Sequence, residues 1–172
     1  MRTCRKCISL MLLWLMFATS FYSCNQTEDG SYVPPITISE KINGEWVLNS
    51  VTQVDEITSK SVDLTGQLSF MSFAIKLQAD DQQQPTTFSV SGQAPALLPA
   101  QGTWTMENNF SNSDATPARI FLYEGSKKTA VLTITATPGN NRVLEFKFTR
   151  KQKGEPFVSY VYNLVPATAA TK

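Results

Sequence analysis

The sequence contains no histidine and only three cysteines among its 172 residues. Without histidine the chain cannot form a Ser-His-Asp or Cys-His catalytic arrangement, and it lacks the side chain that most often binds zinc and haem iron. Charged residues make up 17% of the chain, and the formal net charge is +1. Because phosphate backbones are bound by clustered basic surfaces, this balance argues against nucleic acid as a partner.

The sequence also has little that indicates catalysis or metal binding. No pair of carboxylates stands in a catalytic motif, and there is no phosphate-binding loop. The acidic pair Asp80 and Asp81 lacks the spacing of a calcium-binding loop. We therefore expect a protein that is not an enzyme and that uses neither a metal nor a cofactor.

The beginning of the chain has the pattern of a secretory signal peptide. Arg2, Arg5 and Lys6 precede an apolar run over residues 8–17, and small residues follow that run. The run is shorter than the roughly 20 residues that a membrane-spanning helix needs. We expect cleavage just before Cys24, and the alternative is ordinary cleavage nearby that leaves Cys24 as a free thiol.

The tripeptide Tyr22-Ser23-Cys24 resembles the end of a bacterial lipobox, in which the cysteine receives a diacylglycerol and becomes the mature N-terminus. Phe21 departs from that motif, which prefers Leu at this place. The other two cysteines lie inside the signal peptide, so the mature chain would have no internal disulfide. Glu28 and Asp29 resemble the surface-export signal of Bacteroides-type lipoproteins, and the alternative is retention in the periplasm.

The mature chain is predicted to be all-β. A short helical turn over 39–42 has Ser39 as its expected N-cap. Beyond it, short alternating runs end at turn residues, and Gly125-Ser126 and Pro138-Gly139-Asn140-Asn141 predict hairpins. Evenly spaced short strands are typical of a sandwich or a barrel. The expected strands are 45–54, 69–78, 86–91, 102–107, 119–124, 129–136, 142–150 and 157–165.

Alternation along each strand predicts which side chains face the core. In the seventh strand Leu144, Phe146 and Phe148 share one face, because successive side chains of a strand point to opposite sides. The same rule predicts a bulky interior throughout. The other expected inward residues are Trp46, Met71, Phe73, Ile75, Leu77, Phe88, Val90, Trp104, Met106, Leu132, Ile134, Tyr160 and Tyr162.

Two tripeptides resemble the Gly-x-Trp opening of lipocalin-like barrels. Gly44-Glu45-Trp46 begins the first strand after the helical turn, and Gly102-Thr103-Trp104 begins the fourth. With the lipobox in front, residues 40–166 resemble lipocalin-like domains of unknown function in Bacteroides-type outer-membrane lipoproteins. The resemblance implies an eight-stranded antiparallel, calycin-type barrel. A two-sheet sandwich would produce the same alternation and is the alternative.

The resemblance implies how one barrel end is closed. In lipocalins the tryptophan of the first strand lies under an arginine of the last strand, but here residues 157–165 contain no basic residue. In a barrel, Arg142 would stand at the same end as Trp46 and face inward, so it could cover Trp46 by a cation–π contact. The alternative is that Arg142 is a solvated turn residue. We expect Trp46, Trp104 and Arg142 to close the barrel.

The opposite end is the expected mouth. The apolar loop over residues 92–101 is either a plug for the barrel or a lid over a ligand. Later loops at this end are basic and could favour an anionic ligand or glycan, although turn lysines also serve to keep strand edges soluble. The candidate ligand-binding residues are Leu97, Leu98, Lys127, Lys128, Arg150, Lys151 and Tyr160.

These features predict a lipid-anchored binding or accessory protein of the outer membrane, exposed at the cell surface rather than in the periplasm. It would bind a small molecule, a glycan or an envelope protein through loops at the barrel mouth. The alternative is a small-molecule or glycan carrier with a cavity inside the barrel, and the bulky interior favours the first reading. The expected organisation is a signal peptide over 1–23, a tether over 24–38 after the lipidated Cys24, and one β-barrel domain over 39–172.

Overall fold

The computed structural model describes residues 33–94, 98–110 and 114–169. Residues 36–172 form one compact unit, separate from residues 1–35. The expected signal peptide and Cys24 lie outside the described residues, and so does Leu97. Within the described ranges, no helix has both the length and the apolar character needed to cross a membrane.

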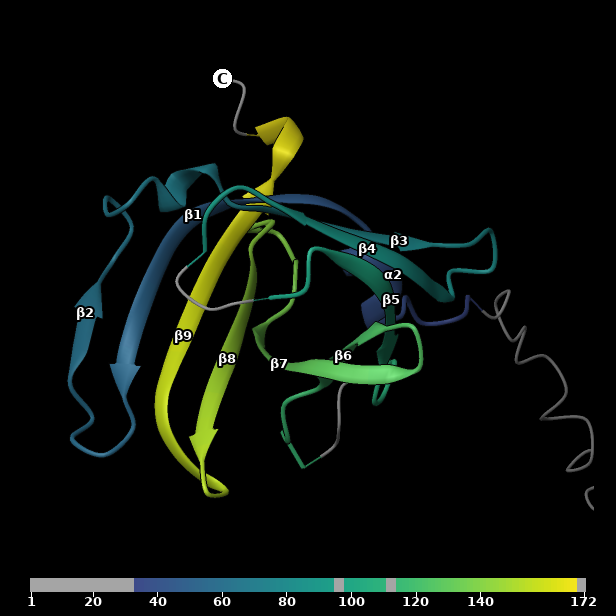
Figure 1. The fold of residues 1–172 in the computed structure, drawn as a ribbon. Helices are drawn as coiled ribbons and strands as arrows, with labels where there is room; N and C mark the ends of the chain where they lie inside the picture. The colour runs from purple at the N-terminus through teal and green to yellow at the C-terminus, as the bar shows by residue number, and fades with distance from the viewer. Residues whose placement is uncertain (1–32, 95–97, 111–113, 170–172) are drawn as a thin grey trace, which may run out of the picture. The chain divides into compact units, whose positions relative to one another are not determined.

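The larger unit is a closed antiparallel β-barrel (Figure 1). The strands follow the order β2-β1-β3-β4-β5-β6-β7-β8-β9, and a second pairing of β1 with β9 closes the sheet. Eight strands therefore form the barrel, and β2 is an extra strand beside β1. The barrel confirms the expected fold class, since a sandwich would consist of two separate sheets. The bounds are β1 (Gly44–Asp55), β2 (Ser61–Asp63), β3 (Ala74–Ala79), β4 (Pro85–Ser91), β5 (Gln101–Met106), β6 (Arg119–Glu124), β7 (Lys127–Ala136), β8 (Leu144–Gln152) and β9 (Glu155–Pro166).

Alternating apolar side chains fill the barrel interior. On β8, Leu144 and Phe146 are fully buried, as the period-two pattern predicts. The ring of Tyr162 on β9 contacts Phe146 and Phe73, with both centroid distances at 5.1 Å. An eight-stranded barrel is narrow enough for such side chains to fill it. The largest fully buried side chains are Trp104, Tyr162, Phe73, Phe146, Ile42, Ile75, Leu77, Ile120, Leu122, Leu132, Leu144 and Leu164.

The expected start of the second strand is wrong. Strand β3 begins at Ala74, and the preceding residues form a short 3-10 helix, η2 (Phe70–Ser72). Leu68 and Ser69 have φ values of 45° and 59°, a left-handed conformation that interrupts an extended strand. Met71 consequently lies on η2, where 53% of it is exposed, instead of facing the core.

Strand β2 was not expected from the sequence. It has three residues, all exposed, and it pairs with β1 alone, from Thr52↔Asp63 to Val54↔Ser61. Because neither face of β2 is buried, its residues show no hydrophobic alternation that could have indicated a strand.

A short helix, α2 (Ile38–Ile42), lies against one end of the barrel. The amide of Ile38 donates to the carbonyl of Asn109, 2.8 Å away, in the segment between β5 and β6. Ser39 is fully buried, and its Oγ donates to the carbonyl of Gln83, 3.1 Å away, in the turn between β3 and β4. Two loops from this end of the barrel are thereby tied to the helix.

The N-cap of α2 is Thr37 and not Ser39. The Thr37 side chain accepts a hydrogen bond from the amide of Glu40 at 3.2 Å, so the N-cap lies two residues earlier than expected. Ser39 is therefore inside the helix, and its hydroxyl serves the contact with the neighbouring turn instead.

Candidate functional site

Strands β7 and β8 pair along only part of their lengths. Their register runs from Ala136↔Glu145 to Leu132↔Phe148 and stops there. Residues 127–131 of β7 pair with β6 alone, and residues 149–152 of β8 pair with β9 alone. Figure 1 shows β7 running beside β6 and away from the lower part of β8, which continues beside β9. The barrel wall is therefore open between these two stretches.

A cavity of about 690 Å³ lies at this opening, and we call it the wall cleft. Its volume falls within the range of roughly 300–1,000 Å³ that is usual for ligand pockets. Apolar and hydroxyl side chains line it together with basic ones. The lining residues are Arg119, Lys128, Thr129, Ala130, Val131, Thr133, Phe148, Thr149, Arg150, Lys151 and Pro156.

The ionisable side chains that line the wall cleft are all basic. Arg119 comes from β6, Lys128 from β7, and Arg150 and Lys151 from β8, and the lining includes no Asp or Glu. A concave surface with charges of one sign concentrates counter-ions and raises the local concentration of an oppositely charged ligand. The wall cleft therefore has the electrostatic character of an anion site.

Two of these cations lie over the ring of Phe121, a half-buried residue of β6. Lys128 Nζ is 4.5 Å from the centroid of the Phe121 ring, and the guanidinium carbon of Arg119 is 5.9 Å from it. Ile120 and Leu122, the neighbours of Phe121, are fully buried, so Phe121 faces outward. Cation–π attraction thus holds Lys128 and Arg119 on the outer face of the barrel, beside the opening.

The positive charge of Arg119 is partly balanced. Its Nε donates to Oε2 of Glu107 at 2.7 Å, and its Nη2 contacts Oε1 of the same carboxylate. This pairing raises the pKa of Arg119 and lowers that of Glu107. On the other side of the opening, the guanidinium carbon of Arg150 lies 5.6 Å from the centroid of the Phe157 ring.

A family model described as a domain of unknown function, DUF5004, matches residues 19–165. The chain belongs to this family. The matched range contains α2, eight complete strands and all but the last residue of β9, so every residue that lines the wall cleft lies within it. Neither the curated proteins nor the solved structures include a match to the chain.

The structure of this DUF5004 domain brings three of the predicted binding residues together. Lys128, Arg150 and Lys151 all line the wall cleft. Lys127 is exposed at the start of β7 and is not among the lining residues. Tyr160 is 8% exposed and faces the core beside Phe148, so it does not line the cleft either.

The predicted apolar loop lies between β4 and β5. Leu98 is half-buried and packs against the core together with Ala94. For Leu98 this packing against the core favours a plug over a lid. Leu97 lies outside the described residues.

The sequence did not indicate Arg119, Thr129, Thr133 or Thr149 as site residues. Arg119 precedes Lys127, the nearest of the predicted lysines, by eight residues, and it comes close to Lys128 only because β6 pairs with β7. The hydroxyl of Thr129 donates to the carbonyl of Leu122 at 3.2 Å, where the register between β6 and β7 shifts. Such neighbours depend on strand pairing, for which no local motif exists.

The expected inward position of Arg142 is wrong. Arg142 is exposed, has a φ of 51° and lies in the turn before β8, two residues short of the strand. Among the described residues, the cation–π contacts involve Phe121 and Phe157, and none joins Arg142 to Trp46. A left-handed turn residue cannot continue the alternation of the strand that follows it.

Both tryptophans of the Gly-x-Trp tripeptides are buried and hydrogen-bonded. Trp46 is 4% exposed, and its Nε1 donates to the carbonyl of Ile42 in α2 at 2.8 Å. Trp104 is fully buried, and its Nε1 donates to the carbonyl of Gln78 in β3 at 2.8 Å. Helix α2 therefore contacts Trp46 directly through this hydrogen bond.

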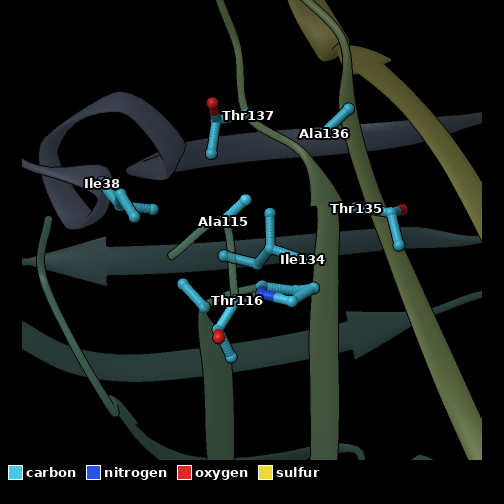
Figure 2. A pocket seen from close by; sticks show the side chains of 9 residues that line it. Ile38, Ala115, Thr116, Ile134, Thr135, Ala136 and Thr137 are labelled. Atoms are coloured by element: carbon cyan, nitrogen blue, oxygen red, sulfur yellow. The ribbon is translucent and has the colours of Figure 1, made fainter. Parts of the chain in front are cut away.

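Two further pockets are described, and both lie away from the wall cleft. One, of about 370 Å³, includes Trp46, Lys41 and Arg142 in its lining. The other, of about 170 Å³, lies between Ile38 of α2 and Ile134 of β7, and Figure 2 shows these two side chains on either side of Ala115. Its volume is below the usual range for ligand pockets.

No group of three or more acidic, Cys or His side chains in the described ranges is placed to hold a metal ion. The lining of the wall cleft itself combines basic side chains, threonine hydroxyls and the apolar side chains Ala130, Val131, Phe148 and Pro156.

Proposed function

We propose that this DUF5004 chain is a lipid-anchored, non-catalytic binding protein of the cell envelope that holds its ligand or partner in the wall cleft. The observation that carries the proposal is the separation of β7 from β8, which opens about 690 Å³ lined by four basic and no acidic side chains. A pocket of this size with convergent polar groups is the usual form of a binding site.

The proposed location depends on the N-terminal sequence. Residues 1–23 act as the signal peptide, and Cys24 carries the lipid that attaches residues 24–38, the tether, to the outer membrane. Glu28 and Asp29 behind the cysteine support display at the cell surface over retention in the periplasm. The chain is in this proposal a lipocalin-like member of the Bacteroides-type outer-membrane lipoproteins, and its residues 39–172 are the binding domain.

The packed core supports binding in the wall and not deep inside the barrel. Trp104, Tyr162 and Phe146 are fully buried in the interior, and the ring of Tyr162 contacts both Phe146 on β8 and Phe73, which directly precedes β3. A carrier of the lipocalin kind needs free interior volume, which these side chains occupy. The wall cleft is the larger of the pockets described, and it opens near the end of the barrel that the sequence indicated as the mouth.

The proposal is tested by thermal unfolding of the full chain with a panel of anionic, neutral and cationic small molecules and peptides. Val131→Trp fills the wall cleft, and Val161→Trp is the matched control, because Val161 is a half-buried valine of β9 outside the cleft. A ligand at 100 times its Kd stabilises the folded state by about 2.7 kcal/mol. We expect a ligand that raises the Tm of the wild type and of Val161→Trp, but not of Val131→Trp.

Equal shifts for the two variants would place binding outside the wall cleft and contradict the proposal. A panel in which no compound raises the Tm of the wild-type chain would contradict it as well.

A further inference from the structure

The strands that border the wall cleft each leave one edge uncovered. No described strand pairs with the cleft-facing edge of residues 127–131 or of residues 149–152. A strand carries backbone N–H and C=O groups along both edges, so these stretches present donors and acceptors to the opening. An extended peptide is the ligand class that offers complementary groups at the same spacing.

The basic side chains beside these edges favour acidic peptides over basic ones. Glu107, which lies outside the lining, pairs with Arg119 and also attracts Lys128, whereas no acidic side chain of the lining balances Arg150 or Lys151. An acidic segment would place carboxylates next to these cations, in a concave site that is only partly open to water. A basic segment would be repelled from the same edges.

The two faces of the opening differ in polarity. Ala130 on β7 and Phe148 on β8 continue the inward rows of these strands, and Ala130 is 4% exposed. Lys128 and Arg119 lie on the outer face, over the outward Phe121. Because side chains of a strand alternate, a strand between β7 and β8 would place every second side chain against the apolar floor and the others beside the cations.

We infer that the wall cleft binds an extended peptide segment with alternating acidic and apolar side chains, which adds as a strand to the open edges of β7 and β8. The segment comes from a protein partner of the cell envelope. This inference rests on the proposed function, in which the wall cleft is the binding site, and it specifies the class of ligand.

The test uses fluorescence anisotropy with the full chain and a labelled, acetylated Glu-Val-Glu-Val-Glu-Val amide. A second peptide has the same sequence with alternate backbone nitrogens methylated, which keeps its charge but removes hydrogen-bond donors from one edge. A third replaces each Glu by Lys. We expect the first peptide to bind, the methylated peptide to bind at least tenfold more weakly, and the Lys peptide not to bind.

Two double variants locate the binding. Arg150→Gln with Lys151→Gln removes two cations of the wall cleft, and we expect at least a tenfold loss of affinity for the acidic peptide. Lys41→Gln with Arg142→Gln is the matched control, because these cations line the separate pocket beside Trp46. The control variant should bind the acidic peptide as the wild type does.

Four outcomes would overturn the inference. Equal binding of the acidic and methylated peptides, or competition by citrate at equal affinity, would mean that charge alone is recognised, and the proposed binding function would stand. Equal loss of affinity in both double variants would mean a diffuse electrostatic effect. If none of the three peptides binds, while the panel still contains a ligand that Val131→Trp blocks, the peptide inference is rejected. The wall cleft would then still be the binding site for another class of ligand.

Discussion

Glu56 illustrates how a single side chain joins the barrel to a loop. Its carboxylate pairs with Lys147 Nζ on β8 at 2.6 Å, and Ser159 also hydrogen-bonds to it. Ser159 is fully buried, and its Oγ lies 2.8 Å from Oγ1 of Thr149, which lines the wall cleft. The hydrogen bond from Lys147 is the largest cause that lowers the pKa of Glu56 from its ordinary value of 4.5, followed by that from Ser159, while partial burial opposes them.

This pKa shift predicts a dependence of stability on pH. Because the pKa of Glu56 is lower in the folded than in the unfolded chain, its stabilising effect is present above 4.5 and is lost as the pH falls through the folded-state pKa. For a partly exposed pair we expect Glu56→Gln to cost up to about 1 kcal/mol at pH 7 and clearly less at pH 3. Urea unfolding at both pH values measures this, with Glu155→Gln, an exposed change on β9, as the control. An equal cost of Glu56→Gln at both pH values would refute the role given to the ion pair.

At the scale of the strand, the two Gly-x-Trp tripeptides need their glycines for different reasons. Gly44 begins β1 with a φ of 135°, a conformation that side-chain-bearing residues rarely adopt. Gly102 on β5 is instead required by close packing, because a Cβ there would lie 1.9 Å from the carbonyl oxygen of Tyr123 on β6. The same motif thus serves a backbone turn in one strand and strand-to-strand contact in another.

We expect Gly102→Ala to destabilise the domain by about 2–3 kcal/mol or more, because β5 and β6 would have to move apart. Gly139→Ala is the matched control, since a Cβ at Gly139 meets nothing within 4 Å. Alanine there should be neutral or slightly stabilising through its effect on the unfolded chain. Urea unfolding of both variants makes the comparison, and similar stabilities would show that β5 tolerates a side chain at this position.

At the scale of the whole molecule, the barrel is stabilised both by closure of the sheet and by packing of its core. Strand β9 pairs with β8 on one side and with β1 on the other, from Trp46↔Pro166 to Asp55↔Val158, so the barrel has no free edge along this seam. Pairing between barrel neighbours is also partial elsewhere, since β1 pairs with β3 only over Gly44–Val47 and with β2 farther along. Between β7 and β8 no other strand covers the edges where the pairing stops, and the filled core supports the wall around this opening.

A filled interior predicts a high cost for removing one of its rings. Phe146 is fully buried and stacks on Tyr162 with a centroid distance of 5.1 Å. We expect Phe146→Ala to reduce the free energy of unfolding by about 3–5 kcal/mol. Met71→Ala, at a position that is 53% exposed, should change it by less than about 0.5 kcal/mol. A Phe146→Ala cost close to that of Met71→Ala would indicate a hollow interior and favour the carrier function.

Much of the fold could be read from local pattern. The predicted strand over 119–124 coincides with β6, and the predicted turn at Gly125-Ser126 joins it to β7. Buried side chains such as Ile75, Leu132 and Phe146 follow the expected alternation. These features are predictable because apolar and polar residues alternate along a half-buried strand, and this alternation is visible in consecutive residues of the sequence.

The amino-acid sequence by itself determined the all-β class, eight of the nine described strands and many of the side chains that fill the barrel, since each depends on residues close together in the chain. Only the tertiary structure decided that β2 joins β1, that Arg142 faces solvent, and that Arg119 meets Lys128 beside the opening. These outcomes depend on which strands pair and where the pairing stops. Registers between strands follow from the packing of the whole barrel, and no short stretch of sequence contains that information.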